Sequence, residues 1–249
     1  MAARKSTLKN VPSKRKPRRL VKALCIRMPG EFPAIEFADF MARAKTVVLR
    51  PKGTEWRELG GASNLMGWRF RNAADGLDEF AKSWAKYGDA LATHEVGYKR
   101  ERALFSFFCG GVSCIEATCY GIYALCSHAK ILSVPFGPDE QRGASPRGLR
   151  DVLKKHPTAS VLTKVLNKML GSPEWKTWLE VRNRIAHRSN LPPIITMSTA
   201  ALPYSPPINV AHTSSTKAFG ATVEDMYRLL TWLGETQREL FLAATALVP

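Results

Sequence analysis

The feature that most constrains the fold is a long apolar stretch from Ala103 to Ser127, in which Glu116 is the only charged side chain. A helix of about 20 apolar residues is long enough to cross a bilayer. Glu116 falls near the middle of this stretch, where a carboxylate costs about 2.5–3.5 kcal/mol on insertion scales. We therefore expect the central, buried helix of a helical bundle, with no membrane partner; a membrane-associated helical protein is the alternative.

Helical periodicity divides this stretch into distinct faces. One face carries only small residues, which let another helix approach closely: Gly110, Cys114, Ala117, Gly121 and Ala124. A second face is polar and consists of Ser113, Glu116, Tyr120, Tyr123 and Ser127. Because an unpaired buried charge is expensive, Glu116 needs a cation, and the arginines that follow Val181 are the candidates. Such a pair either only orients two helices or also positions a catalytic arginine, with Tyr120 in support.

The rest of the body also has the period of amphipathic helices, so the predicted fold class is all-α, an up-and-down bundle of about five helices. Ser145-Pro146 and Ser172-Pro173 each combine an N-cap residue with proline at the first helical position, and they predict two helix starts. Further helices are expected at about 36–48, 75–95, 163–170 and 223–248. The second helix start opens a helix that continues to about Arg188, because Pro192-Pro193 cannot extend it.

Composition divides the chain into three regions. Residues 1–30 form a basic arm that we expect to be disordered, and residues 31–73 an N-terminal helix followed by irregular chain. Residues 74–249 form the helical bundle. Within the bundle, residues 189–218 contain five prolines, and a segment of this kind is usually a functional loop or disordered.

The net charge of +16 is concentrated at the N-terminus, where residues 1–30 hold ten lysines and arginines and no acid. An arm of this kind binds polyanions, serves as a targeting signal or is only a solvated tail. We expect it to bind RNA through Lys14, Arg15, Lys16, Arg18 and Arg19. The five cysteines form no CxxC pair, which favours buried, reduced thiols and a cytoplasmic protein.

The densest polar cluster is "RNRIAHR", from Arg182 to Arg188. On a helix, Asn183 and His187 share one stripe, so Asn183 can orient the imidazole. Arginine stabilises extra negative charge on phosphate, and histidine transfers protons near neutral pH. RNA supplies its own nucleophile, the 2′-hydroxyl, so such a site can cleave RNA without a metal. Arg184 and Arg188 form a second stripe that we expect to contact RNA, and Glu180 is predicted to pair with Arg184 on the surface.

The hexapeptide Arg182 to His187 resembles the R-N-x-x-x-H form of the Rx4-6H motif of HEPN domains, and the similarity extends loosely over residues 74–247. The resemblance implies a HEPN-like helical bundle that dimerises with its two motifs facing each other. It also implies a metal-independent endoribonuclease from a toxin–antitoxin or phage-defence setting, with an antitoxin or a nucleotidyltransferase as partner. Arg182 and His187 would be catalytic, and Asn183 would support them. A homodimer would supply two histidines, one as base and one as acid.

Other classes of site find little support in the sequence. The five histidines are scattered and no HExxH or paired-cysteine pattern occurs, so we expect no metal site. We expect no cofactor, because no GxxxxGK[ST] loop and no GxGxxG after a strand is present. The alternative function is a non-catalytic helical module that binds nucleic acid or a protein partner through the same arginines.

Overall fold

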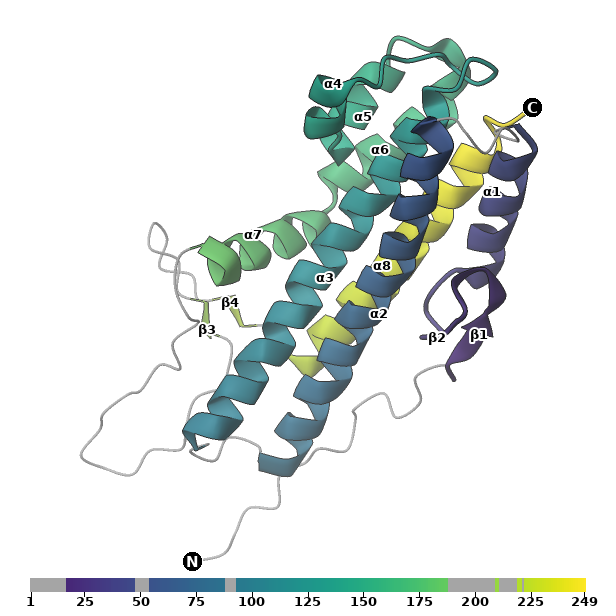
Figure 1. The fold of residues 1–249 in the computed structure, drawn as a ribbon. Helices are drawn as coiled ribbons and strands as arrows, with labels where there is room; N and C mark the ends of the chain where they lie inside the picture. Colours follow the sequence, from purple (N-terminus) through teal and green to yellow (C-terminus); the bar gives the residue numbers. More distant parts are fainter. Residues whose placement is uncertain (1–16, 48–53, 88–92, 188–208, 211–218, 221) are drawn as a thin grey trace, which may run out of the picture.

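The computed structural model describes residues 17–47, 54–87, 93–187, 209–210, 219–220 and 222–249 (Figure 1). The described part contains eight α-helices and two short pairs of strands, so the chain is all-α as predicted. Eight helices exceed the predicted number of about five. Helix α4 was not predicted; it is short and lies, with the predicted α5, at one end of the long helices (Figure 1).

The two longest helices, α2 (Thr54–Tyr87) and α3 (His94–Cys126), run antiparallel along the length of the molecule (Figure 1). They approach closely at glycines on both sides. A Cβ added to Gly76 would lie 2.6 Å from the carbonyl oxygen of Ala103, and one added to Gly110 would lie 2.9 Å from the amide nitrogen of Ala73. The small-residue face of α3 therefore does receive another helix, and that helix belongs to the same chain.

Helix α2 corrects two predictions. Residues 54–73 were expected to be irregular, and they are helical. The helix predicted from Asp75 to Glu95 instead begins at Thr54 and ends at Tyr87, and Gly97 lies inside α3 rather than ending a helix. The reason is burial of an apolar face with helical spacing, whose members include Leu59, Met66, Phe70 and Leu77. That burial outweighs the low helix propensity of the glycines in this segment.

Helices α1 (Ala34–Val47) and α8 (Val223–Thr245) complete the core beside α2 and α3 (Figure 1). Phe37 and Phe40 of α1 pack on Phe241 of α8, with ring centroids 5.5 Å apart in both cases. A buried polar contact links α8 to α3, because the side-chain amide of Gln237 donates to the hydroxyl of Thr118 at 3.0 Å. Both helices start within two residues of their predicted positions.

The remaining helices are α4 (Pro138–Gly143), α5 (Pro146–Leu153), α6 (Ser160–Gly171) and α7 (Pro173–His187). Both predicted serine caps are confirmed. The hydroxyl of Ser145 accepts from the amide of Gly148 at 3.1 Å, and that of Ser172 accepts from the amide of Trp175 at 3.1 Å. Helix α7 runs at an angle to α3 and leaves the bundle at its C-terminal end (Figure 1).

Residues 17–30 are folded onto the body, which corrects the arm predicted for residues 1–30. Strands β1 (Arg19–Val21) and β2 (Ile26–Met28) pair antiparallel around a short 3-10 helix, Lys22–Leu24. Cys25 takes a left-handed conformation with a φ of 53° at the end of that turn. Val21, Leu24 and Met28 are buried, so apolar contacts hold the hairpin in place despite its charge. Residues 1–16 lie outside the described part.

The predicted loop 189–218 lies mostly outside the described residues. A short antiparallel pairing joins β3 (Asn209–Val210) to β4 (Phe219–Gly220) and thus brings the two ends of the intervening segment together.

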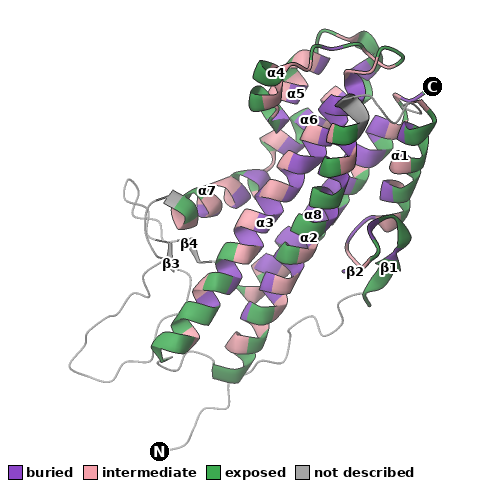
Figure 2. Cartoon of the chain, viewed as in Figure 1, coloured by how far each residue is buried: buried purple, intermediate pink, exposed green. Residues whose placement is uncertain are grey.

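Burial separates the two interpretations of the apolar stretch. Helix α3 is long and apolar enough to cross a membrane, but 67% of its most apolar 18-residue window is buried inside the protein. Figure 2 shows exposed residues concentrated toward the end of α3 that begins at His94, while its other half is mostly buried. This is the pattern of a core helix in a bundle.

Candidate functional site at the junction of α3 and α7

Helix α7 is attached to α3 through a tryptophan. The indole of Trp178 is fully buried, and its ring centroid lies 4.6 Å from that of Phe107 and 5.4 Å from that of Phe108. It lies directly on Gly111, where any added Cβ would collide with the indole ring. The position of this ring fixes the next turn of α7, which carries Arg182.

Arg182 reaches Glu116, as the sequence predicted. Its Nη2 lies 3.5 Å from Oε1 of Glu116, at the upper limit for a hydrogen bond. The two side chains are 26% and 44% exposed, so the pair lies at the rim of the protein and not in its interior. An ion pair with this exposure contributes little to stability.

One donor of the arginine has no acceptor. The Nε of Arg182 is buried and has no hydrogen-bond partner among the described residues. The indole Nε1 of Trp178, one turn earlier on α7, is also buried and has no acceptor among the described residues. A buried donor without an acceptor costs about 1–3 kcal/mol. The two donors lie one turn apart on α7, and both are buried.

Burial and the charge of Arg182 shift the pKa values of the groups around the pair in opposite directions. Burial raises the pKa of Glu116 above its ordinary value of 4.5, while the attraction of Arg182 lowers it. Burial also raises the pKa of the Cys109 thiol, with Arg182 lowering it and Glu116 raising it. Cys109 therefore belongs to this cluster, although no local pattern in the sequence indicates it. Its raised pKa favours the neutral thiol over the thiolate nucleophile.

The hydroxyl of Tyr120 is hydrogen-bonded to a residue of α2. Its hydroxyl donates to Oε2 of Glu58 on α2, at 2.6 Å. Burial and this carboxylate raise the pKa of Tyr120 to about 12. Tyr120 thus joins α3 to α2 one turn beyond Glu116. Its predicted supporting role beside Glu116 stays a prediction, while the contact that the structure shows is this link to Glu58.

The other residues of the motif differ in their surroundings. The side chain of Asn183 is exposed. Arg184 is paired with Glu180 at 3.2 Å, as predicted, but only 15% of its side chain is exposed, so the pair is not the expected surface pair. The predicted contact of Arg184 with RNA would require this mostly buried side chain to become accessible. His187 is the last residue of α7, and its side chain lies outside the described residues, as does all of Arg188.

The basic residues assigned to RNA from the N-terminal region are separated by the structure. Arg18 is bound by two carboxylates of α2, Asp75 and Asp78, the latter at 3.0 Å, so its charge is already neutralised within the chain. Arg19 is exposed on β1. Lys14, Arg15 and Lys16 lie outside the described part.

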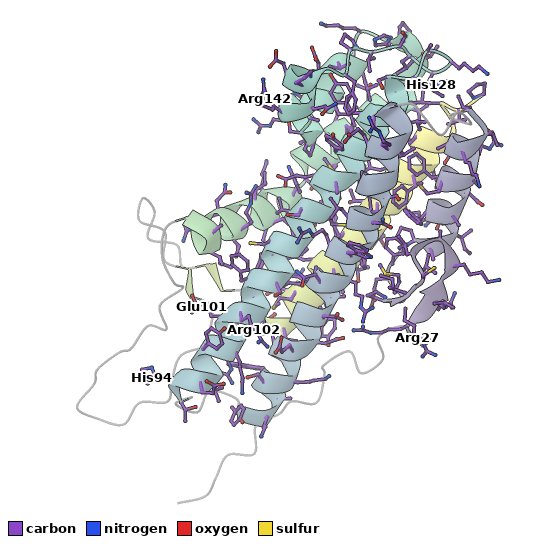
Figure 3. The ribbon with its side chains drawn as sticks, in the orientation of Figure 1. Arg27, His94, Glu101, Arg102, His128 and Arg142 are labelled. Atoms are coloured by element: carbon purple, nitrogen blue, oxygen red, sulfur yellow. The ribbon has the colours of Figure 1, made fainter. Side chains whose placement is uncertain are left out.

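Two of the described histidines lie far from each other. His94 and His128 lie at opposite ends of α3 (Figure 3). Among the described residues, no group of three or more His, Cys, Asp and Glu side chains could hold a metal ion.

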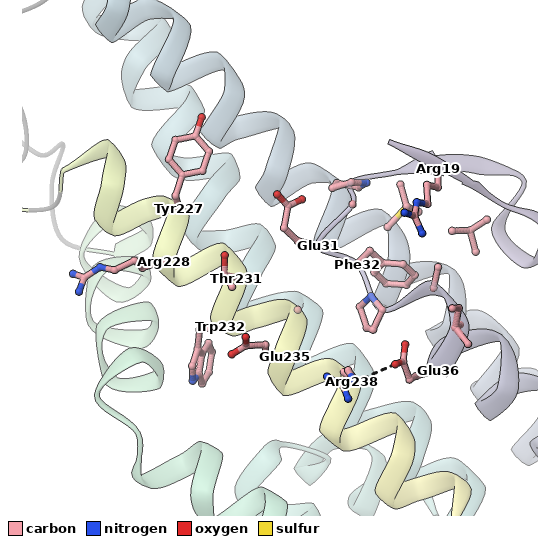
Figure 4. A pocket seen from close by; sticks show the side chains of 18 of the residues that line it. Arg19, Glu31, Phe32, Glu36, Tyr227, Arg228, Thr231, Trp232, Glu235 and Arg238 are labelled. Carbon is pink, nitrogen blue, oxygen red and sulfur yellow. Dashed lines mark ion pairs between the residues drawn. The ribbon is translucent and has the colours of Figure 1, made fainter. Parts of the chain in front are cut away.

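A hollow of about 840 Å³ lies elsewhere, between the N-terminal hairpin region and α8 (Figure 4). Glutamates outnumber arginines in its lining, and Arg238 is paired with Glu36 at 3.1 Å. It contains no histidine or cysteine, and none of the predicted catalytic residues lines it. The hollow and the Arg182 cluster are therefore separate features.

Comparison of the chain with protein-family models, curated proteins and solved structures gives no match.

Proposed function

We propose that the protein is a metal-independent endoribonuclease of the HEPN type, in which Arg182 and His187 act on RNA at the junction of α3 and α7. One observation carries the proposal: Arg182 is held at the rim by Glu116 while its buried Nε lacks an acceptor. A partly exposed guanidinium whose donors are not all hydrogen-bonded can bind phosphate oxygens. The acidic partner keeps the guanidinium oriented while the site is empty.

In the proposed reaction, the 2′-hydroxyl of the substrate attacks the adjacent phosphorus, and the 5′-oxygen of the next nucleotide leaves. A base must take the hydroxyl proton and an acid must protonate the leaving oxygen. His187 of one chain supplies one of these groups, and His187 of a second chain supplies the other. Arg182 stabilises the extra negative charge that develops on the phosphoryl oxygens. Asn183 orients the histidine.

A homodimer is part of this proposal because each chain carries one motif histidine. The small-residue face of α3 offers no support for it, since α2 of the same chain covers Gly110 and Gly121. Sedimentation at micromolar concentration tests the requirement. A strict monomer that still cleaves RNA contradicts the two-histidine mechanism.

The test of the activity compares variants on varied RNAs in EDTA. Arg182→Ala and His187→Ala should each reduce cleavage by about 10²-fold or more. Arg142→Ala, an exposed arginine of α4 far along the chain from the motif, is the matched control and should be unaffected. The product should end in a 2′,3′-cyclic phosphate, and RNA with a 2′-O-methyl group at the cut site should be inert. Equal rates for the wild type and His187→Ala contradict the site.

A non-catalytic binding module is the second candidate. Arg182 is partly exposed and held in place by Glu116, and a guanidinium in this position can hold a phosphate without any cleavage. If RNA binds through Arg182 and no RNA is cleaved by the wild type, the binding module is the correct function.

A further inference from the structure

A basic and aromatic face on α2 adjoins the Arg182 cluster. The exposed residues of α2 between its first turns and Asp75 recur every three or four positions, so they form one face, which we name the α2 face. It consists of Arg57, Asn64, Leu65, Trp68, Arg69 and Asn72. Trp68 and Leu65 are 52% and 40% exposed, which is unusual for large apolar side chains this close together.

The charge of this segment is positive. Residues 57–72 contain three arginines and one glutamate, and that glutamate, Glu58, accepts the hydroxyl of Tyr120. Arg71 is paired with Asp75 at 3.4 Å. Arg57 and Arg69 form no ion pair within the described part of the chain. Among the described residues, Arg69 next to the exposed indole and Arg57 three turns earlier on the same face thus have no carboxylate partner.

The α2 face is continuous with the candidate site. The side-chain amide of Asn72 donates to the carbonyl oxygen of Ser106 on α3 at 3.2 Å. Ser106 lies one turn before Cys109, whose thiol is affected by the charges of Arg182 and Glu116. At the other end of the face, Glu58 reaches Tyr120, one turn beyond Glu116. Side chains of α2 thus contact the segment of α3, from Ser106 to Tyr120, that also carries Glu116, the partner of Arg182.

We propose that the α2 face binds unpaired RNA, with bases stacked on Trp68 and phosphates held by Arg69 and Arg57. The proposal rests on the proposed function for RNA as the ligand, and it adds the surface and the single-stranded form. Cations combined with exposed aromatic rings bind single strands, because every base has a face that can stack. In a duplex the bases are already stacked on each other, so a duplex gains only the phosphate contacts. The face extends about 22 Å along α2, enough for several nucleotides.

A partner protein is the competing occupant of such a face. Apolar contact alone would suit a second copy of the chain. Free arginines would then have to be desolvated against an identical face carrying the same positive charge, which disfavours self-association through this surface. An anionic ligand matches both the charge and the aromatic group.

The test measures binding of the full chain to 2′-O-methyl RNA, which cannot be cleaved by the proposed reaction. An unstructured 12-mer and a hairpin duplex of the same length are compared by fluorescence anisotropy. Trp68→Ala should weaken binding of the single strand about tenfold and leave duplex binding unchanged. Trp68→Phe should retain most of the affinity. Arg69→Ala should weaken both ligands by a similar factor. Leu242→Ala removes an apolar side chain of α8 that is 50% exposed, and it should change nothing.

The basic N-terminal residues are identical in the wild type and in Trp68→Ala, so their phosphate contacts cancel when the two proteins are compared on the same RNA. The inference is overturned if Trp68→Ala binds both RNAs like the wild type, or if it changes only the oligomeric state in sedimentation. Cleavage of natural RNA without any effect of Trp68→Ala on single-strand binding would retain the proposed function and reject the face. A single-strand preference that depends on Trp68, without cleavage, would retain the face and reject the enzyme.

Discussion

Helix α3 contacts α2 and α7 in two different ways. Toward α2, glycines bring the two backbones together, and the polar side chains of the contact have partners across it, such as Arg102 with Glu79 and Tyr120 with Glu58. Toward α7, the contact begins with the buried ring of Trp178 and ends at the half-exposed pair of Arg182 and Glu116. Two buried donors on that side have no acceptor in the part of the chain that the structure describes. The first contact is built for stability. The contact with α7 is less stable than a fully hydrogen-bonded contact would be, as is common at sites that bind ligands.

The largest expected effect follows from removing the ring that anchors α7. Trp178→Ala should lower the free energy of unfolding by about 3–5 kcal/mol, because it leaves a large cavity between α3 and α7. RNA cleavage should be lost as well, since Arg182 is no longer held against α3. Lys176→Ala, on the exposed side of the same helix, is the control. Thermal unfolding and a cleavage assay measure the two effects, and a Trp178→Ala variant with unchanged stability would contradict the anchoring role.

The contact between α2 and α3 is tested by a pair of glycines in the same helical hairpin. Gly76→Val forces a side chain against the backbone of Ala103 and Phe107 and should cost about 1–3 kcal/mol. Gly97→Ala meets nothing within 4 Å and should stabilise the protein by about 0.5–1 kcal/mol through helix propensity. For a chain of this size, 1 kcal/mol shifts Tm by about 2–4 °C. Equal shifts for both variants would show that α2 and α3 are not closely packed.

The smallest effect on stability, and the most specific, is the pH dependence of Glu116. Its pKa is raised in the folded protein, so the folded state binds the proton more tightly than the unfolded state. The contribution to stability is therefore greatest below pH 4.5 and is lost as the pH rises through the raised pKa. Glu116→Gln should remove this decline. Thermal melts of both proteins from pH 4 upward give the difference; a wild type that gains on the variant with rising pH would mean that Arg182 outweighs burial.

Features that depend on neighbouring residues in the sequence, such as helix caps, could be predicted from the sequence. The caps at Ser145 and Ser172 follow from the side-chain oxygen of one residue and the fixed φ of the next, and the structure has both. The pair of Glu116 and Arg182 could also be predicted, because a lone carboxylate on an apolar helix requires a cation and the motif offers several.

Long-range packing could not be predicted in the same way. Residues 54–73 look irregular because Gly60, Gly61 and Gly67 weaken a helix, yet Leu24 of the N-terminal hairpin lies against Gly67 and occupies the space that a side chain would fill. The link between Tyr120 and Glu58 spans 62 residues and has no local signature. The hairpin itself was hidden by its charge, since only Val21, Leu24 and Met28 reveal its buried side.

The role of Arg182 is tested by comparing RNA cleavage by Arg182→Ala and by the wild type, on one RNA, in EDTA, with matched thermal melts. Cleavage should fall by about 10²-fold or more with an unchanged melting temperature, because Arg182 lies at the rim and its ion pair contributes little to stability. Equal cleavage by the two proteins would contradict this role, and so would a loss of activity that only parallels unfolding.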